Sequence, residues 1–158
     1  MKMSKICVFF GHRTASSKIV ESLKQQIRRL VLEEGIKVFW VGGYGDFDMY
    51  AASAVRTIKS ELPDEGIELD LIYAYLPSPT AKEQQAYQVK LYDGTIYPEG
   101  VEIGPPKFAI TRRNRWMAEN CDIVLAFINR DSGGAYTAVK VAKRKGKRII
   151  NLGTLEIK

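Results

Sequence analysis

A glycine pair, Gly133 and Gly134, has Ser132 before it and Thr137 after it, and this group could hold a phosphate. The apolar run 123–128 precedes the group and a segment with helical spacing follows it, so we expect a turn from a strand into a helix. Glycines leave the main-chain N–H groups accessible, and the start of a helix carries free donors and the positive end of the helix dipole. Both hydroxyls could bind a phosphate, and helix capping is the competing role for both. The pattern predicts an anion site, with an ordinary strand-to-helix turn as the alternative.

A second glycine-rich turn begins at Gly42 and Gly43, after the apolar run 36–41. Asp46 and Asp48 follow these glycines, at the place where the next helix should start. One of the two carboxylates is expected to cap that helix. The other could accept hydrogen bonds from ribose hydroxyls, as an acidic residue does in dinucleotide-binding folds.

The first apolar run, 5–10, ends in Gly11, His12 and Arg13. His12 could stack on a base or donate a hydrogen bond to a phosphate, or it could be a polar residue with partners only in the protein. Its place beside Arg13 at the end of a strand favours a role in the site.

Arg113 and Asn114 lie in a short predicted helix, 108–119. The planar guanidinium group of Arg113 is well shaped to clamp a phosphate with two parallel hydrogen bonds. Arg113 could also be one of three surface arginines, together with Arg112 and Arg115. Asn114 could bind a ribose or a phosphate, or hold the start of the helix.

These residues fall at the ends of strands that alternate with helices. The predicted strands are 5–10, 36–41, 67–75, 123–128 and 148–152, and helical spacing is found over 23–31, 47–62, 108–119 and 135–142. Strands joined in this way form a right-handed doubly wound layer whose ligands bind beyond the C-terminal strand ends. We therefore predict a three-layer, Rossmann-like α/β fold with a mainly parallel sheet of about five strands.

The segment between the third strand and the arginine helix has a less regular pattern. Residues 80–91 are polar and compatible with a helix, and 92–106 form one long irregular stretch. Tyr92, Asp93 and Tyr97 in this stretch could cover a bound base, or they could pack over the edge of the sheet.

The composition is that of an ordinary globular protein. The chain has 158 residues, of which 46% are hydrophobic and 27% charged, and this suits one well-buried domain spanning 1–158. We expect a cytoplasmic protein, because no apolar run reaches membrane-spanning length and the start shows no signal-peptide pattern. Cys7 and Cys121 lie in or beside apolar runs, as reduced buried cysteines do, and there is one histidine. This pattern argues against a metal site, and no cofactor is expected to be required.

The net charge of +6 is concentrated in the run 140–148, at the end of the last predicted helix. Cations near a helix C-terminus are stabilised by the dipole, so a solvated helix end is the favoured interpretation. Binding of DNA or RNA by this run is the alternative, although no aromatic residues are interleaved with the charges.

Four motifs together resemble the SLOG superfamily over about 5–152: Gly11-His-Arg13, Gly42-Gly-x-Gly-x-Phe-Asp48, Arg113-Asn-x-x-Met117 and Gly133-Gly-x-x-Thr137. This Rossmann-like superfamily includes the Lonely Guy phosphoribohydrolases and the DNA-processing protein DprA, and the closer resemblance is to its YpsA-like bacterial branch. The resemblance implies a nucleotide or nucleotide-derived ligand at the C-terminal strand ends, with its phosphate in the turn at Gly133.

The resemblance also bears on catalysis. In the hydrolase branch, an arginine four residues before a methionine and a glutamate three residues after the threonine act in cleaving the base from ribose 5-phosphate. Arg113 fits the first position, whereas Lys140 occupies the second. A carboxylate there would stabilise an oxocarbenium-like centre, and an ammonium group would oppose it. We therefore expect a sensor, a carrier or an enzyme with a different catalytic carboxylate, and the sequence identifies no catalytic residue.

The expected ligands are AMP, ADP-ribose, an NAD relative or a ribose phosphate. Two alternatives stay open. One is an N-glycosidic nucleotide hydrolase that uses Asp48, Asp131 or Glu119, and the other is a nucleic-acid-binding protein that uses the run 140–148. A homodimer is open as well, because Trp116 and the tyrosine-rich stretch would serve an interface or the core equally well.

Overall fold

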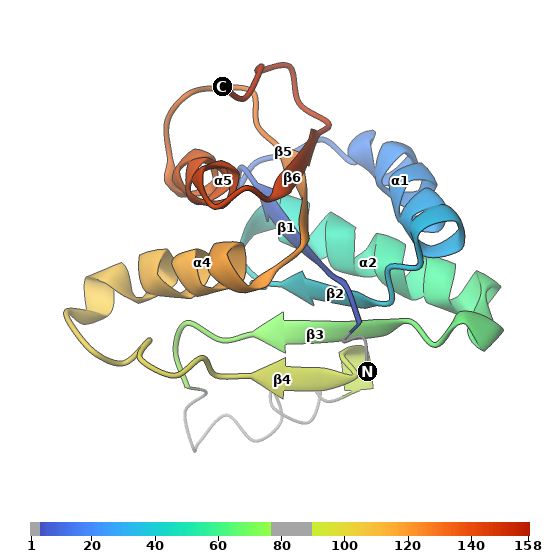
Figure 1. Ribbon diagram of the computed structural model, residues 1–158, viewed down its shortest axis with the longest axis horizontal. Coiled ribbons are helices and arrows are strands. Elements are labelled where there is room, and N and C mark those ends of the chain that lie inside the picture. The colour runs from blue at the N-terminus through green and yellow to red at the C-terminus, as the bar shows by residue number, and fades with distance from the viewer. Residues whose placement is uncertain (1–3, 77–89) are drawn as a thin grey trace.

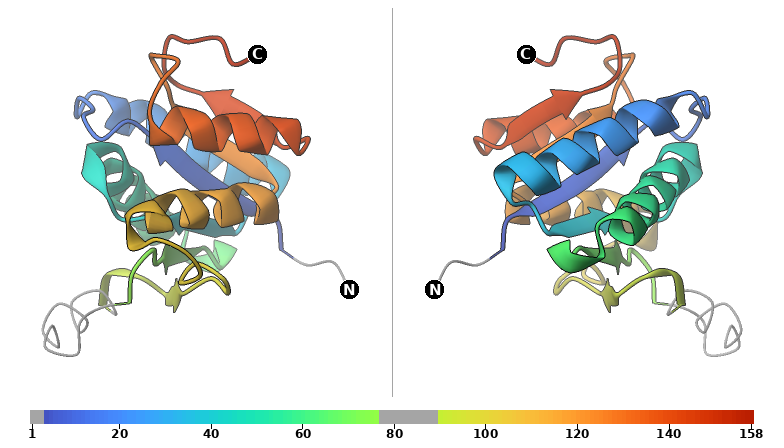
Figure 2. Two further views of the ribbon diagram at one scale, coloured as in Figure 1. Left: turned by 90° about the vertical axis from the view of Figure 1, so that its left-hand side faces the viewer. Right: turned by 90° about the vertical axis from the view of Figure 1, so that its right-hand side faces the viewer.

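The computed structural model describes residues 4–76 and 90–158, which form a parallel β-sheet between two layers of helices (Figures 1 and 2). The sheet order is β4-β3-β2-β1-β5-β6, and every pair of neighbouring strands is parallel. The strands are β1 (Ile6–Gly11), β2 (Val38–Val41), β3 (Glu68–Ile72), β4 (Gly94–Ile96), β5 (Ile123–Phe127) and β6 (Arg148–Asn151). The predicted three-layer α/β class is confirmed, with six strands in the described residues where the sequence predicted about five.

Helices cover both faces of the sheet. On one face, α1 (Ile19–Glu34) packs against α2 (Gly45–Glu61). On the other face, α4 (Ala109–Asn120) packs against α5 (Gly134–Arg144), and the two views of Figure 2 show these two layers in turn. Two short 3₁₀ turns, η1 (Pro63–Glu65) and η2 (Pro106–Phe108), follow α2 and precede α4.

The alternation of side chains along β1 divides the core between the two faces. Cys7 and Phe9 belong to the cluster under α1 and α2, whereas Val8 belongs to the cluster under α4 and α5. In the second cluster, Trp40 of β2 stacks on Trp116 of α4, with ring centroids 4.9 Å apart. Trp116 therefore contributes to core packing.

The strand that the sequence pattern did not reveal is β4, which lies inside the stretch predicted to be irregular. It has only three residues, and the first, Gly94, is a weak strand former. Gly94 pairs in register with Asp70 of β3, whose carboxyl is buried. An added Cβ at position 94 would lie 2.7 Å from Asp70 Oδ1, so the glycine makes room for this carboxyl at the edge of the sheet.

The tyrosines near β4 pack against the protein. Tyr92 lies against the core under α1 and α2, and the guanidinium of Arg56 lies over its ring. Tyr97 packs with Ala74 and Ala109 in a small third cluster. These contacts favour the packing interpretation of this stretch over base covering. The helix predicted for 80–91 falls largely outside the described residues.

In the described ranges, no helix has both the length and the apolar character needed to cross a membrane. Cys7 and Cys121 are buried and free, and burial raises the pKa of both thiols. The two cysteines are therefore protonated, reduced core residues, as the sequence predicted.

Candidate functional site

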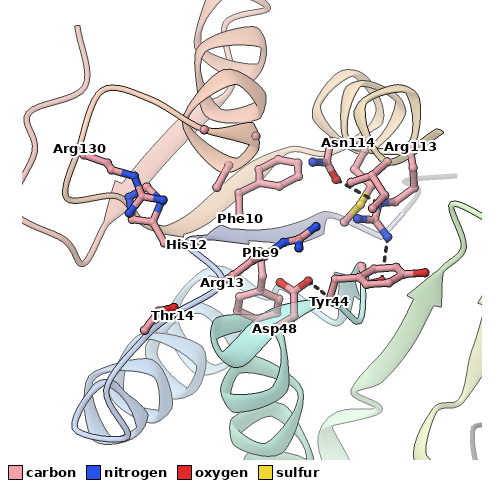
Figure 3. Close-up of a pocket in the computed structure, with 17 residues that line it drawn as sticks. Phe9, Phe10, His12, Arg13, Thr14, Tyr44, Asp48, Arg113, Asn114 and Arg130 are labelled. Carbon is pink, nitrogen blue, oxygen red and sulfur yellow. Dashed lines mark hydrogen bonds between the residues drawn. The ribbon is translucent and has the colours of Figure 1, made fainter. Parts of the chain in front are cut away.

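A cavity of about 350 Å³ opens at the C-terminal ends of the central strands (Figure 3). The strand order reverses at this point, because the chain runs from β1 towards β4 on one side and returns to β5 on the other. The wall comes from the end of β1, the β2–α2 turn, α4 and the β5–α5 turn. The lining residues are Phe9, Phe10, Gly11, His12, Arg13, Thr14, Gly42, Tyr44, Asp48, Ile110, Arg113, Asn114, Met117, Arg130, Gly133, Gly134 and Ala135.

Three arginines give the cavity its positive charge. Arg113 is buried in the wall at 3% exposure, whereas Arg13 and Arg130 are exposed. The start of α5 at Gly134 adds free N–H groups close to Arg130. Asp48 is the one acidic side chain among the described lining residues. This arrangement suits an anionic ligand.

Asn151 holds the β5–α5 turn in place. Its side chain accepts hydrogen bonds from the N–H groups of Ile128 and Gly153 and donates to the carbonyls of Ile128 and Leu155, over distances of 2.7 to 3.0 Å. Gly133 then adopts a φ of 96°, a conformation that favours glycine, and α5 begins at the next residue. The glycine pair thus forms the predicted strand-to-helix turn, and it does so at the cavity wall.

His12 holds the other side of the same turn (Figure 3). Its Nε2 accepts a hydrogen bond of 3.0 Å from the main-chain N–H of Asn129, so the proton of the neutral ring is on Nδ1. Burial, and then the positive charge of Arg130, lower the pKa of His12 below its usual 6.5. His12 is therefore neutral at pH 7 and keeps one ring N–H as a donor.

Arg113 joins the ends of two strands. Its Nη1 donates to the carbonyls of Gly42 at 2.7 Å and Ile72 at 3.1 Å, and its Nε donates to Asn114 Oδ1 at 3.0 Å. A Cβ at position 42 would lie 2.6 Å from Arg113 Cζ, so the glycine leaves space for the guanidinium. Burial lowers the pKa of Arg113, and the neighbouring Asp48 carboxylate acts in the opposite direction. Nη2 of Arg113 makes no hydrogen bond to any described residue. In this conformation a ligand can therefore bind one nitrogen of the guanidinium, whereas the predicted clamp uses two.

Asp48 lies in the first turn of α2 and faces the cavity beside Tyr44 (Figure 3). The main-chain N–H of Tyr44 donates to Asp48 Oδ2 at 3.1 Å. Burial raises the pKa of Asp48 to about 6, while the hydrogen bond from Tyr44 and the charge of Arg113 act to lower it. The Tyr44 ring centroid lies 5.6 Å from Arg113 Cζ, and Tyr44 as a residue is 46% exposed. An acceptor, a cation and an exposed aromatic ring therefore meet at this end of the cavity.

Most of the predicted ligand residues come together in the cavity. Those that line it are Gly11, His12, Arg13, Gly42, Asp48, Arg113, Asn114, Gly133 and Gly134. Gly43, Ser132 and Thr137 are not part of the lining. Thr137 Oγ1 donates to the carbonyl of Gly133 at 3.0 Å, so its hydroxyl is engaged within the first turn of α5.

Other residues considered from the sequence have different partners. The Asp46 carboxylate accepts a main-chain N–H from the loop after β1 at 3.4 Å. Arg112 donates to three carbonyls of the loop before η2, and Arg115 pairs with Glu119 at 3.5 Å. Asp131 is exposed and does not line the cavity.

Lys140 also lies outside the cavity lining. Its Nζ donates to the main-chain oxygen of Lys158. The position at which the resemblance to the hydrolases requires a glutamate therefore contacts the C-terminal segment in this chain.

Three polar lining residues were not predicted: Thr14, Tyr44 and Arg130. The sequence could have predicted Arg130 as a lining residue, because this basic residue lies three positions before the glycine pair, inside the turn after β5. It could have predicted Tyr44 too, since this residue lies between the glycines of the β2–α2 turn. The apolar lining residues, such as Phe10 and Met117, have no signal that separates them from the rest of the core.

No protein-family model matches the chain, and no curated protein matches it. Among solved structures, the DNA processing protein A (DprA) of Streptococcus pneumoniae is similar, with a TM-score of 0.62 and 21% identity, over 94% of this chain and 50% of that one. DprA of Helicobacter pylori, described by its single-stranded DNA binding mode, gives a TM-score of 0.63 and 17% identity, over 93% of this chain and 64% of that one. This chain thus spans half to two thirds of the DprA structures. The likeness shows a shared fold, and the resemblance to the Lonely Guy and YpsA-like branches stays a prediction.

Proposed function

We propose that the cavity binds the phosphate group of a nucleotide, either as a free small molecule or as a unit of single-stranded nucleic acid. The observation that carries the proposal is the convergence of Arg13, Arg113, Arg130 and the start of α5 on one cavity at the strand ends. Guanidinium groups and a helix N-terminus are the groups that bind phosphate in proteins.

The two exposed arginines have the leading role in this proposal. Arg130 lies beside the Gly133 turn and Arg13 follows β1, and neither makes a hydrogen bond or ion pair through its side chain within the described residues. Arg113 is tied to Gly42 and Ile72, so it supplies mainly a positive field and a fixed wall. A phosphate would therefore meet Arg13 and Arg130 together with the N–H groups of α5.

The size of the cavity favours a small ligand. About 350 Å³ lies near the lower end of the range of about 300 to 1,000 Å³ that is usual for small-molecule sites. A mononucleotide or a ribose phosphate suits this space better than ADP-ribose or an NAD relative. The exposed ring of Tyr44 offers a surface on which a base could stack.

Single-stranded nucleic acid is the second candidate, and the similarity to the two DprA structures favours it. In this form of the proposal, Arg13, Arg130 and the start of α5 hold a phosphate of the strand, and Tyr44 contacts an unstacked base. The basic run 140–148 is not required, because the cavity alone combines charge with an exposed aromatic ring.

A nucleotide hydrolase is the remaining alternative. Of the three carboxylates considered for it, only Asp48 lines the cavity, whereas Glu119 pairs with Arg115. An enzyme of this kind would have to use Asp48. Release of free base from AMP by the native protein, and not by Asp48→Asn, would favour this alternative.

The direct test is binding of AMP, ribose 5-phosphate, ADP-ribose, NAD and inorganic phosphate, followed by thermal shift and calorimetry. We expect AMP and ribose 5-phosphate to raise the melting temperature, and Arg130→Ala to weaken both by about tenfold or more. Arg115→Ala is the matched control, because it removes an exposed arginine outside the cavity. If none of the five compounds binds, the small-molecule form of the proposal is wrong, and if Arg130→Ala binds them as the native protein does, the phosphate does not lie in this cavity.

Arg113→Ala is the weaker test, since it would leave the carbonyls of Gly42 and Ile72 without their donor and disturb the fold. His12 offers a better second measurement, because it is the only histidine and gives one set of imidazole NMR signals. The charge of Arg130 lowers its pKa. A phosphate bound beside Arg130 should therefore raise the pKa of His12, and Arg130→Ala should raise it without ligand.

A further inference from the structure

Asn114 presents a hydrogen-bond donor to the cavity that no described part of the protein uses. Its Oδ1 accepts the Nε–H of Arg113 at 3.0 Å, and because arginine nitrogens only donate, this bond decides which end of the amide faces Arg113. Nδ2 therefore lies away from Arg113, on the side of Phe10 (Figure 3). Asn114 lines the cavity, and its Nδ2 makes no hydrogen bond to any described residue.

The orientation of this donor is fixed by the strands below it. Arg113 is buried, and its Nη1 donates to the carbonyls of Gly42 and Ile72, at the ends of β2 and β3. A series of hydrogen bonds thus runs from the two strand ends through the guanidinium to the amide of Asn114. Because the guanidinium cannot turn without losing these bonds, Nδ2 stays directed at the cavity.

The acidic group nearest to this amide has partners within the protein. Asp48 is the one acidic side chain among the described lining residues. The main-chain N–H of Tyr44 donates to its Oδ2 at 3.1 Å, and the main-chain N–H of Gly43 and the charge of Arg113 also stabilise the carboxylate. The start of α2 and Arg113 therefore account for Asp48. The group that α4 leaves open to a ligand is a donor, so the matching part of the ligand is an acceptor.

The base of a nucleotide is the part that falls at this end of the cavity. In the proposed function the phosphate lies at Arg130 and the start of α5, and Figure 3 shows Arg130 and Asn114 far apart across the cavity. The exposed ring of Tyr44, on which a base could stack, lies at the end where Asn114 is found (Figure 3). The lining residues Ile110 and Met117 come from the turns of α4 on either side of Asn114. An apolar wall with one fixed donor suits a heterocyclic base.

We propose that Asn114 reads the base of the bound nucleotide through Nδ2 and selects a 6-oxopurine, hypoxanthine or guanine, over adenine. The inference rests on the proposed function, because it takes the phosphate to lie at Arg130 and the start of α5. A 6-oxopurine presents two neighbouring acceptors, O6 and N7, whereas adenine presents N7 beside the N6 amino donor. Asparagine reads adenine by accepting from N6 and donating to N7, and this requires Oδ1, which Arg113 occupies here. An amino group placed against Nδ2 would set two donors against each other.

The experiment compares IMP with AMP, which share the sugar and the phosphate and differ at position 6 of the purine. Ribose 5-phosphate is the probe without a base, and calorimetry at pH 7.5 measures all three. We expect IMP to bind about tenfold more tightly than AMP, because one acceptor on the base is replaced by a donor. Asn114→Ala should weaken IMP and change the affinity for ribose 5-phosphate by less than about threefold.

Asn114→Asp is the sharper variant. It keeps the acceptor for Arg113 Nε and replaces the donor that faces the cavity by an acceptor, so the preference for IMP over AMP should disappear or reverse. The added negative charge weakens the binding of every phosphate compound and cancels in the ratio of IMP to AMP. Asn120→Asp is the matched control, because it makes the same change on the same helix outside the cavity, and it should keep the native ratio.

The outcomes separate this inference from the proposed function. Equal binding of IMP and AMP by the native protein would overturn the role of Asn114 and leave phosphate binding intact. A preference for IMP that persists in Asn114→Asp would overturn it as well. If Asn114→Ala weakened ribose 5-phosphate as strongly as IMP, the amide would bind the sugar or the phosphate and not the base. If none of the three compounds binds, the small-molecule form of the proposed function fails, and this inference fails with it.

Discussion

Asp48 carries a charge that works against the stability of the fold. Burial raises its pKa from the ordinary 3.8 to about 6, so the folded protein binds this proton more tightly than the unfolded chain does. The stabilisation from the protonated group is complete below about pH 4 and is lost as the pH rises through 6. At pH 7.5 the ionised group costs about 3 kcal/mol as an upper bound. We therefore predict that Asp48→Asn raises the melting temperature at pH 7.5.

Thermal or urea melts between pH 5 and pH 8 measure this effect. The advantage of Asp48→Asn should shrink by roughly half between pH 7.5 and pH 5, because the native carboxyl becomes protonated in the folded state. Asp46→Asn is the control, since the Asp46 carboxylate is not in the cavity lining. A stability difference that stays constant with pH would show that packing, and not the charge, is responsible.

At the scale of elements, Asn151 at the end of β6 positions the β5–α5 turn through two hydrogen bonds to Ile128. Two more, to Gly153 and Leu155, fix the segment after β6. Asn151→Ala leaves main-chain groups of Ile128, Gly153 and Leu155 without partners, and we predict a loss of about 2 to 4 kcal/mol in the free energy of unfolding. Because the turn carries Arg130 and the start of α5, the affinity for AMP should fall as well. Urea denaturation and calorimetry measure the two effects.

The control for Asn151 is Asn120, which makes one side-chain hydrogen bond, to the carbonyl of Trp116 at an exposed helix end. Asn120→Ala should cost less than about 1 kcal/mol and leave AMP binding unchanged. An Asn151→Ala protein as stable as the native one would contradict the positioning role.

The elements that the sequence predicted well are those with a local signal. The apolar runs before Gly11, Gly42 and Gly133 marked three strands, and the glycine turns after them marked the edge at which the cavity lies. β4 had no such signal, because a three-residue edge strand that begins with glycine takes its stability from pairing with β3. The sequence could not predict the partners of Arg113 either, since Gly42 and Ile72 lie 71 and 41 residues away along the chain.

On the scale of the whole molecule, the cavity and the basic run 140–148 lie at opposite ends of α5. The cavity lies at the start of α5, whereas Lys143 and Arg144 lie in its last turn, about 14 to 15 Å further along the helix. Much of the charge in the run is engaged within the protein. Lys145 lies 3.6 Å from Glu119, and Arg148 pairs with Glu34, whose pKa it lowers through that hydrogen bond. A nucleic acid bound in the cavity and one bound at the run 140–148 would therefore lie at different places on the protein.

This difference gives the last prediction. Replacing Lys143, Arg144 and Lys145 together by alanine should lower the affinity for single-stranded oligomers by no more than about threefold, because these charges lie far from the cavity. The pair Arg13→Ala and Arg130→Ala should lower it by more than about tenfold and reduce the slope of log K against log salt by about 1.4, which corresponds to two lost phosphate contacts on a single strand. Fluorescence anisotropy over a salt series measures both quantities. If the triple variant weakened binding more than the double variant did, the nucleic-acid site would lie at the basic end of α5. The cavity would then bind small nucleotides alone.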